Sequence, residues 1–467
     1  MHSSIHRIFV NFNIMASINN FIFWTKNYLF RPNAIKQYKA SLVNIENDSN
    51  LKTLNWKKRV SIIRYAYNNI PFYKKYYDDN GFHPNMLKSE NDWNLVPILE
   101  KKYIKHNLNE LLSPQANNKY LETVFTGGST GTPLKFYTDK RFCKEIQAWR
   151  MFKIWGISPA DNHGIVHRRV PTSLVPKLKN RILWYPTKRI YLNVCSLTEE
   201  IIKNFVEELI SNKIIWIQGY VGGLEQVADF ILKYKYKITS LKLVWSTSAP
   251  LSKNVRLKME QAFNCKVMNQ YGCTEVWNIA MGCPNSDNMH ISFDYVHVDI
   301  IDNHNKNIFN KEGDILITDL ENYICPLIKY RLGDRGTLLS EKCICGNPLP
   351  ILRPVKGRIS DSIYTPKGLY ISGEYLTTLF DDFPLYYSQY QIYQHSDFSI
   401  DINVVLAMNN NNDIANDLKR IKDILIRNTN NEIPIKINIV ENIKDDKGKI
   451  RYILSEIAIK KYRSDLD

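Results

Sequence analysis

Residues 126–133 read TGGSTGTP and combine three glycines with four hydroxyl side chains directly after the apolar pair Val124-Phe125. Glycines let the backbone approach an anion closely, and the amide and hydroxyl groups can donate hydrogen bonds to its oxygens. A Walker-type nucleotide loop ends in Gly-Lys-Ser/Thr, whereas this segment ends in Gly-Thr-Pro. The pattern therefore indicates a phosphate-binding loop of another kind, and a flexible surface turn is the alternative.

A second group of residues could bind a metal. Cys283 and His290 are separated by six residues, and Cys343 and Cys345 lie in the later segment CICGNP. Gly346 and a following proline favour a turn in which two sulfur atoms converge. Three cysteines and one histidine form a closed tetrahedral set that suits structural Zn²⁺ and leaves no open position for catalysis. The alternative is that these cysteines are small buried apolar residues.

The composition is that of a globular protein with a basic surface. The chain has 467 residues, of which 44% are hydrophobic and 23% charged, and it carries a formal charge of +16. Between Lys135 and Arg189 there are 13 basic residues and three acidic ones. This excess favours anionic partners such as nucleotides and phosphorylated substrates, and a solvated basic face is the alternative. Net charge alone suggests nucleic acid, but no zinc-finger spacing or RNP pattern supports it, so we expect no nucleic-acid partner.

The eight cysteines are scattered and follow no secretion signal, which predicts a reducing, cytoplasmic setting. The segment 5–30 is apolar and aromatic, but Arg7, Lys26 and several asparagines interrupt it. We therefore expect no transmembrane segment here. Helix packing on the main domain is the preferred interpretation, with docking at a membrane interface left open. The oligomeric state is not predicted.

These residues must be positioned by alternating helices and strands. Ser196 and Glu199 suggest a capping box, and one face of the helix that follows them carries Ile202, Phe205, Val206, Leu209 and Ile210. The segments IIWIQ, LKLVWSTSAP and VRLKMEQAFNCKVMNQYG continue the alternation and predict a layered α/β body. After residue 361 a strand, an amphipathic helix at 414–425 and the alternating segment PIKINIV predict a small α+β unit. KGRISD, residues 356–361, marks the boundary.

Four further segments occur in a fixed order behind TGGSTGTP: NQYGCTE (269–275), CPLIKYRLGDRG (325–336), KGRISD (356–361) and KGKIRYI (447–453). Together they resemble the motifs of adenylate-forming enzymes. NIPFYKKYYDDNGFHP, VPILEKKYIKHN, IAMGCPNSDNMHI and CICGNPLP are similar to signatures of the phenylacetate–CoA ligase group and its CapK-like relatives in capsular polysaccharide assembly. Each motif is short, but five in the right order are not a chance match.

The resemblance implies the adenylate-forming fold, with a large N-terminal multi-sheet α/β domain at 1–356, a hinge at 357–361 and a small mobile α+β domain at 362–467. Residues 1–110 would form a helical N-terminal portion. It also implies ATP as substrate and Mg²⁺ as its counter-ion. The phosphate loop would consist of Thr126, Gly127, Gly128, Ser129, Thr130 and Gly131, where Gly127 replaces the family's usual serine.

The remaining site residues follow from the same resemblance. Thr274 and Glu275 match the catalytic pair of the Tyr-Gly-x-Thr-Glu motif, with Glu275 linked to magnesium. Asp334 matches the ribose-binding aspartate. The adenine slot would be formed by Ser248, Ala249 and Pro250 with Asn269, Gln270, Tyr271 and Gly272, although aromatic core packing competes for the tyrosine. Arg358 fits the arginine near ribose and phosphate, although it could instead bond hinge carbonyls.

Lys449 follows Gly448 in the position of the adenylation lysine, and Lys447 is its competitor because the usual flanking serine and proline are absent. Ser360 stands at the hinge. Tyr137, His167 and Trp277 are candidates for the acid pocket, against ordinary packing or surface roles for each.

The implied reaction is AMP-forming activation of a small-molecule carboxylic acid, followed by transfer to an acceptor, with the CoA thiol preferred. An amine or hydroxyl acceptor, including a nucleotide-sugar, remains the CapK-like alternative. A non-catalytic adenylate-binding protein is a third interpretation. The sequence does not name the acid.

Overall fold

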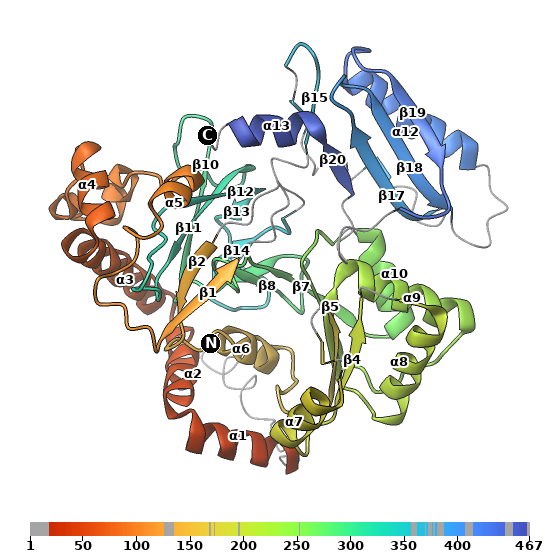
Figure 1. Ribbon diagram of the computed structural model, residues 1–467, viewed down its shortest axis with the longest axis horizontal. Coiled ribbons are helices and arrows are strands. Elements are labelled where there is room, and N and C mark those ends of the chain that lie inside the picture. Colours follow the sequence, from red (N-terminus) through yellow and green to blue (C-terminus); the bar gives the residue numbers. More distant parts are fainter. Residues whose placement is uncertain are drawn as a thin grey trace, which may run out of the picture.

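The computed structural model describes residues 18–125, 135–167, 170–171, 173–194, 197–251, 253–355, 362–368, 370–371, 376, 379–380, 387–406, 414–443 and 452–464. They form a large body of helices and sheets and a smaller carboxyl-terminal unit, drawn in blue above it in Figure 1. The helices are α1 (Ile18–Phe30), α2 (Pro32–Asn44), α3 (Asp48–Asn69), α4 (Pro71–Asp79), α5 (Lys101–Asn107), α6 (Ile146–Ile154), α7 (Leu174–Trp184), α8 (Glu199–Ser211), α9 (Val221–Tyr234), α10 (Lys253–Phe263), α12 (Ile414–Asn428) and α13 (Glu456–Ser464), with 3₁₀ turns at Pro84–Met86 and Glu90–Leu95.

The strands of the body are β1 (Leu121–Phe125), β2 (Lys135–Asp139), β3 (His163–His167), β4 (Arg189–Asn193), β5 (Trp216–Tyr220), β6 (Leu243–Thr247), β7 (Lys266–Tyr271), β8 (Ala280–Gly282), β9 (Met289–Ile291), β10 (Val296–Ile301), β11 (Gly313–Asp319), β12 (Tyr330–Gly336), β13 (Leu338–Leu339) and β14 (Ile351–Leu352). Those of the carboxyl-terminal unit are β15 (Ile363–Tyr364), β16 (Tyr370–Ile371), β17 (Tyr387–Gln394), β18 (Ile400–Leu406), β19 (Ile435–Ile439) and β20 (Ile453–Ser455).

A nine-stranded sheet in the order β13-β14-β9-β8-β7-β6-β5-β3-β4 organises the body. The strands from β7 to β4 are parallel neighbours, and those from β7 to β13 are antiparallel. The helices α8, α9 and α10 connect successive strands and share one apolar core with them. The strands β5 and β6 are buried almost throughout, as expected of parallel strands covered on both faces.

The α8 helix shows where the sequence-based prediction succeeds and where it errs. Its buried face consists of Ile202, Phe205, Val206 and Leu209, as the periodicity predicts. The prediction was wrong in two details. The helix begins at Glu199 with Thr198 as its N-cap, whose side chain accepts a hydrogen bond from the Ile201 amide, so Ser196, which lies outside the described residues, is not the cap. Ile210 is 41% exposed because it lies beyond the edge of the buried stripe.

Two smaller sheets pack beside the large one. The β1 and β2 strands form an antiparallel hairpin whose connection is the segment 126–134, outside the described residues. The β10, β11 and β12 strands form a three-stranded sheet, and a register shift between Asp314 and Leu316 interrupts the pairing of β11 with β12. The side chains of this sheet share one core with α3 and α4.

The amino-terminal helices are attached to the body by aromatic packing and by a buried ion pair. In α1, Phe23 and Trp24 contact Trp149 of α6 edge to face. Arg150, also in α6, donates two hydrogen bonds to the carboxylate of Asp294, at 2.9 and 2.8 Å, and both side chains are buried. No helix in the described part of the chain is long and apolar enough to cross a membrane.

The carboxyl-terminal unit has a four-stranded sheet in the order β19-β18-β17-β20, covered by α12 through Leu418, Ile421 and Leu425. It contacts the body at α9 and α10. Asn254 of α10 donates a hydrogen bond to the Phe380 carbonyl at 3.0 Å. The two units therefore meet at the helices that cover the parallel sheet (Figure 1).

Candidate functional site

The parallel strands end side by side at one edge of the large sheet. The final residue of β3 is His167, that of β5 is Tyr220, and β6 and β7 end at Thr247 and Tyr271. In open parallel sheets, ligands bind outside the carboxyl ends of the strands. The predicted adenine-slot residues 248–250 and 269–272 lie at or directly after these ends. The structure therefore brings the two predicted segments to the same edge.

Ser248 has an unusual backbone conformation directly after β6. Its φ is +81°, in the region that non-glycine residues rarely adopt. Such a conformation costs of order 1 kcal/mol and is often found where a chain is shaped around a ligand. The strained backbone at the start of the turn 248–250 is thus consistent with a ligand-binding turn at this edge.

Gly272 is required by the close approach of another backbone segment. A Cβ atom at this position would lie 1.9 Å from the Trp277 carbonyl oxygen, so no side chain fits. Gln270, two residues earlier, is buried, and its side chain accepts from the Trp245 indole at 2.9 Å and donates to the Trp277 carbonyl at 3.3 Å. Its side chain is therefore used in the core.

Tyr271 and Asp334 link two of the sequence motifs directly. The Tyr271 hydroxyl donates a hydrogen bond of 2.8 Å to Oδ2 of Asp334, a carboxylate that is 7% exposed in the middle of β12. The bond joins the end of β7 to the three-stranded sheet. It orients one oxygen of the carboxylate. The remaining lone pairs of the carboxylate can accept further hydrogen bonds.

The loop after Tyr271 carries the other predicted catalytic residues. Thr274 is exposed and Glu275 is half-buried, so both can meet a ligand from solvent. Cys273 lies between them and the strand, partly buried against the core. Burial, and then the neighbouring Glu275 carboxylate, raise the pKa of its thiol well above the ordinary value. Carboxylate oxygens are suitable Mg²⁺ ligands, so Glu275 fits the predicted metal role chemically.

Three predicted elements fall outside the described residues. They are the phosphate segment Thr126–Gly131, the hinge with Arg358 and Ser360, and the lysine Lys449. Their flanks are described. Phe125 and Lys135 are paired across the hairpin that carries the phosphate segment. Tyr452, three residues after Lys449, is buried beside α9, where burial and then the Glu225 carboxylate raise the pKa of its hydroxyl well above the ordinary value.

The candidates for the acid pocket divide into two kinds. Trp277 packs against Trp245, with ring centroids 6.5 Å apart, in a core cluster on the α6 side of the sheet. His167 stays at the strand edge and contacts Tyr220, with ring centroids 4.1 Å apart. Sequence reasoning missed Tyr220, although its position at the end of a buried strand could have indicated it.

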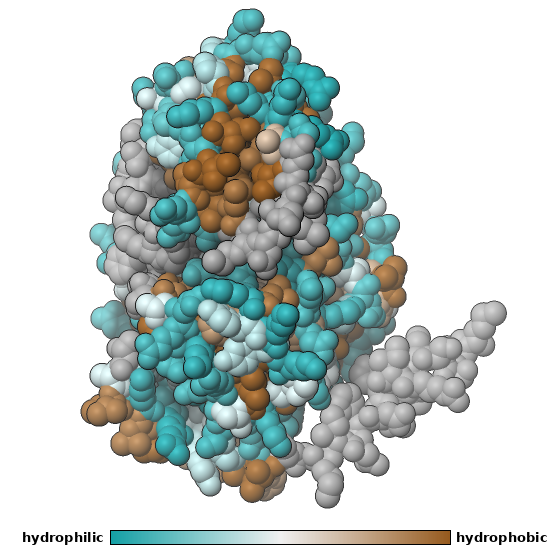
Figure 2. Space-filling view, turned by 90° about the vertical axis from the view of Figure 1, so that its right-hand side faces the viewer, coloured by the Kyte–Doolittle hydropathy of each residue, from teal (hydrophilic) through white to brown (hydrophobic). Residues whose placement is uncertain are grey.

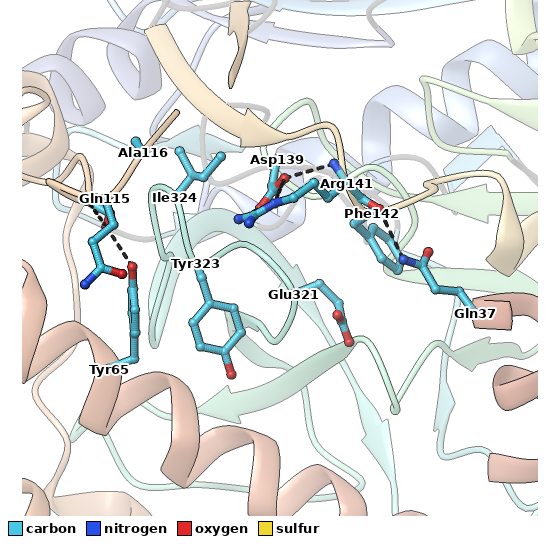
Figure 3. Close-up of a pocket in the computed structure, with 11 residues that line it drawn as sticks. Gln37, Tyr65, Gln115, Ala116, Asp139, Arg141, Phe142, Glu321, Tyr323 and Ile324 are labelled. Atoms are coloured by element: carbon cyan, nitrogen blue, oxygen red, sulfur yellow. Dashed lines mark hydrogen bonds and ion pairs between the residues drawn. The ribbon is translucent and has the colours of Figure 1, made fainter. Parts of the chain in front are cut away.

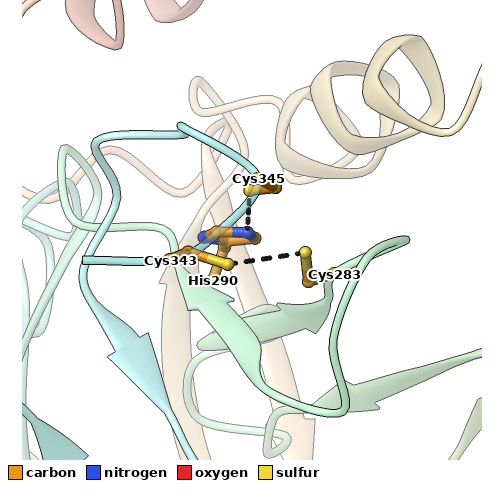
Figure 4. Close-up of side chains that lie close together, drawn as sticks. All are labelled: Cys283, His290, Cys343 and Cys345. Carbon is orange, nitrogen blue, oxygen red and sulfur yellow. Dashed lines mark hydrogen bonds between the residues drawn. The ribbon is translucent and has the colours of Figure 1, made fainter. Parts of the chain in front are cut away.

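The four predicted zinc ligands come together in one cluster (Figure 4). All four ligand atoms lie within 4.8 Å of one another. Sγ of Cys283 and Sγ of Cys343 are 3.6 Å apart, and Sγ of Cys345 is 3.3 Å from Nε2 of His290. The pairing of β9 with β14 causes this, because it places Ile351 opposite His290 and brings the CICG turn over the end of β8.

The electrostatics of two of the four residues suit metal ligands, whereas burial raises the pKa of the Cys345 thiol to about 12. Burial lowers the pKa of His290 to about 4, so its imidazole is neutral near pH 7. Burial would raise the pKa of the Cys343 thiol, but hydrogen bonds from Cys345, Ser286 and Cys283 outweigh it and lower the pKa below the usual value. A neutral imidazole and a readily ionised thiol are the forms that bind a cation.

A separate cavity of about 410 Å³ lies beside α3 and the base of the β1-β2 hairpin (Figure 3). Its lining includes Tyr65, Tyr323, Glu321 and the pair Asp139–Arg141, whose Nε–Oδ1 distance is 2.9 Å. Asp139 pairs with Leu121, at the opposite end of the hairpin from segment 126–134. The rise of the strand from Leu121 to Phe125 separates the two ends by about 14 Å, so this cavity lies away from the end of the hairpin that leads into segment 126–134.

Comparison with known proteins agrees with this geometry. Residues 363–456 match the family model of the CapK C-terminal domain. The chain is 24% identical over 341 residues to Protein CapK of Staphylococcus aureus, covering 70% of this chain and 71% of that protein. It is 25% identical over 304 residues to phenylacetate-coenzyme A ligase of Aromatoleum evansii, covering 62% and 66%. These similarities support a CapK-like chain of the adenylate-forming kind.

Solved structures share the fold of this chain. A crystal structure of 2-hydroxyisobutyryl-CoA ligase in the postadenylation state matches with a TM-score of 0.68 at 16% identity, covering 90% of this chain and 92% of that one. The amide bond synthetase McbA of Marinactinospora thermotolerans matches with a TM-score of 0.52 at 13% identity, covering 75% and 70%. The predicted fold class, a large multi-sheet α/β body with a small α+β unit, is confirmed.

Proposed function

We propose that this chain is an AMP-forming ligase that activates a carboxylic acid with ATP and transfers the acyl group to the CoA thiol. The observation that carries the proposal is the 2.8 Å hydrogen bond from Tyr271 to Asp334. It joins a carboxylate from one of the motifs to the tyrosine of another, for which we propose stacking on the adenine base, at the carboxyl edge of a parallel sheet. Relatives named phenylacetate-coenzyme A ligase support the same reaction class.

In the first step, an oxygen of the substrate carboxylate attacks the α-phosphorus of ATP, and the bond to the departing pyrophosphate breaks. Two anions must approach each other, so the site must supply donors and cations to the developing charge. In our proposal the glycine-rich segment 126–131 binds the departing phosphates and Lys449 bridges the carboxylate and the α-phosphate. Asp334 accepts from the two ribose hydroxyls, and Glu275 would hold the Mg²⁺ that neutralises the phosphates.

The position of Tyr452 supports the assignment of Lys449. Tyr452 is buried beside Glu225 of α9, and Lys258 of α10 lies 2.9 Å from the same carboxylate and 3.0 Å from Asp229. The chain leaving the Gly-Lys segment is therefore anchored on the helices of the body.

A second acceptor class has its own support. An amine or hydroxyl acceptor is the alternative that the CapK-like resemblance implies, and residues 363–456 match the CapK C-terminal domain. A sugar or amino acid in surface-polysaccharide biosynthesis would supply such a group. In either case the protein would work in the cytoplasm, where ATP is available and thiols stay reduced, in keeping with the free cysteines among the described residues.

We also propose that the Cys283–His290–Cys343–Cys345 cluster holds a structural Zn²⁺. A tetrahedral ion with Zn–S near 2.3 Å and Zn–N near 2.05 Å places two sulfurs about 3.8 Å apart and a sulfur about 3.6 Å from the nitrogen. In the structure one sulfur–sulfur distance is 3.6 Å and one sulfur–nitrogen distance is 3.3 Å, and all four ligand atoms lie within 4.8 Å of one another. The cluster needs only small adjustments to fit the ion, and four protein ligands leave no position for substrate.

The reaction is tested by measuring ATP-dependent pyrophosphate release with a panel of carboxylic acids, with and without CoA. Release that depends on one acid supports the ligase, and a thioester product with CoA identifies the acceptor. If the adenylate forms but CoA is not acylated, amines and nucleotide-sugars are tested next. No release with any acid favours a non-catalytic adenylate-binding protein.

The metal is tested independently. Elemental analysis of the purified protein should give about one zinc per chain, because the cluster provides one four-ligand site. Cys345→Ser should lose the metal and stability, whereas Cys265→Ser, a cysteine outside the cluster, should lose neither. Metal-free protein of full stability, with all three cluster thiols open to alkylation, would contradict the proposal.

A further inference from the structure

An apolar surface is formed by the outward faces of two neighbouring helices. We call it the α1/α7 face, and it consists of Ile18, Phe21, Tyr28, Leu29, Phe30, Leu174, Val175, Leu178, Ile182, Leu183 and Tyr185, all exposed. The two helices lie side by side at the lower end of the body in Figure 1, and apolar patches are visible at the lower end of Figure 2. Lys26 of α1 donates to the Tyr185 carbonyl at 2.8 Å, and Phe23 stacks on Trp184.

The α7 helix turns its apolar side to solvent, whereas an ordinary surface helix packs that side against the core. Successive helical residues are about 100° apart, so Leu174, Leu178 and Ile182 form one stripe along it. These side chains are 84%, 60% and 67% exposed, and no residue of α7 is buried. The side that contacts the body carries Trp184, which packs edge to face on His163, and Asn180, which accepts from Arg189 at 3.0 Å. The apolar stripe therefore faces solvent.

The size of this surface calls for a partner. Eleven large apolar side chains, each roughly two-thirds exposed, add up to on the order of 1,000 Å², whereas the largest patch on a typical monomer is about 300–600 Å². Exposed apolar area of this extent is characteristic of a protein or membrane interface.

The charges around the face decide which partner fits. Lys177, Lys179 and Arg181 flank the α7 stripe, and Lys188 follows it, all exposed. The segments 18–45 and 162–198 contain four and seven basic residues and no aspartate or glutamate. A two-fold contact with a second copy would set these cations against their own copies, which disfavours a homodimer. The partner must therefore offer both negative charge and an apolar region.

We propose that the α1/α7 face binds the surface of an anionic lipid bilayer. An apolar stripe flanked by lysine and arginine is the arrangement of helices that lie in the plane of a membrane interface. With 11 residues, α7 is about 16 Å long, half of the roughly 30 Å hydrocarbon core, so it would lie along the surface rather than cross it. Tyr28 and Tyr185 suit the headgroup level, where aromatic side chains gather.

The proposal is tested by flotation of the full-length protein with phosphatidylcholine vesicles, with and without about 30 mol% phosphatidylglycerol. We expect binding to the anionic vesicles that weakens as salt is raised, because exposed cations contribute to it. Leu178→Glu combined with Ile182→Glu should reduce binding by about tenfold per substitution. Replacing Lys177, Lys179 and Arg181 by glutamine should reduce it by about fivefold per charge.

A matched control introduces the same two charges elsewhere. Leu257 and Phe309 are 52% and 55% exposed and lie outside the face. Leu257→Glu with Phe309→Glu should leave vesicle binding unchanged, and circular dichroism should show all variants folded. The proposal is overturned by wild-type protein that does not float or that binds neutral vesicles equally well. Equal binding by the Leu178/Ile182 variant also overturns it. So does a wild-type dimer that this variant dissociates, because a second copy would then occupy the face.

Discussion

Replacing Asp334 by asparagine tests the proposed nucleotide edge with the smallest change of shape. The carboxylate is buried and accepts from Tyr271 through Oδ2, and in our proposal it also accepts from both ribose hydroxyls of ATP. Asparagine keeps one acceptor oxygen and replaces the other by an NH₂ group, which cannot accept. One hydrogen bond to a charged group is lost, which is worth about 1.5–3 kcal/mol. We therefore expect the Kd for ATP to rise about 10- to 150-fold.

Tyr271→Phe tests how much the orientation of the Asp334 carboxylate contributes to ATP binding while the carboxylate itself is kept. It removes the hydroxyl that donates to Asp334 and keeps the ring that would stack on adenine. We expect ATP binding to weaken by about 1 kcal/mol, the typical net value of one hydrogen bond. Because the two residues are in contact, the double variant should lose less than the sum of the single losses.

Isothermal titration calorimetry with ATP measures all three variants. Glu312→Gln is the control, since Glu312 is bound to Arg335 at 2.8 Å on the same small sheet and its loss removes one nearby negative charge. If Asp334→Asn binds ATP within twofold of wild type while remaining folded, the ribose assignment is wrong. An equal loss in Glu312→Gln would mean that only the net charge of the region matters.

Three further predictions address the lysine, the buried ion pair and acid stability. Lys449→Ala should lose adenylate formation but still transfer a preformed acyl-adenylate, and normal pyrophosphate release would refute the assignment. Arg150→Met should lower the free energy of unfolding, measured in urea, by about 3–5 kcal/mol because it leaves the buried Asp294 carboxylate without its ion-pair partner. The control Lys203→Met, which breaks an exposed ion pair, should change it by under about 0.5 kcal/mol. Burial lowers the pKa of His163 to about 3, so the unfolded chain binds one more proton than the folded chain between about pH 6 and 4. The free energy of unfolding therefore falls there by up to about 1.4 kcal/mol per pH unit as the pH decreases. His163→Gln should remove that part of the slope, measured by urea titrations at several pH values.

Much of the fold could be predicted from the sequence because its signals are local. The apolar runs ending in IIWIQ and LVWST give β5 and β6 directly, and the spacing of Leu418, Ile421 and Leu425 gives the buried face of α12. Helix ends were less certain, since Ser196 and Thr198 are both good caps and only the backbone geometry selects Thr198.

The sequence by itself determined which chemical groups are present and in what order: the adenylate motifs, the cysteines and histidine, and the basic segments without acids. Tertiary structure alone decided which of them meet. Tyr271 and Asp334 are 63 residues apart and Cys283 and Cys343 are 60 apart, and strand pairing brings each pair into contact. The sequence is limited in the same way for α7, because its periodicity predicts an apolar stripe but not whether that stripe faces the core or solvent. A helix presents its stripe to whatever lies beside it, and here Trp184 and Asn180 hold the opposite side against the body, so the stripe faces outward.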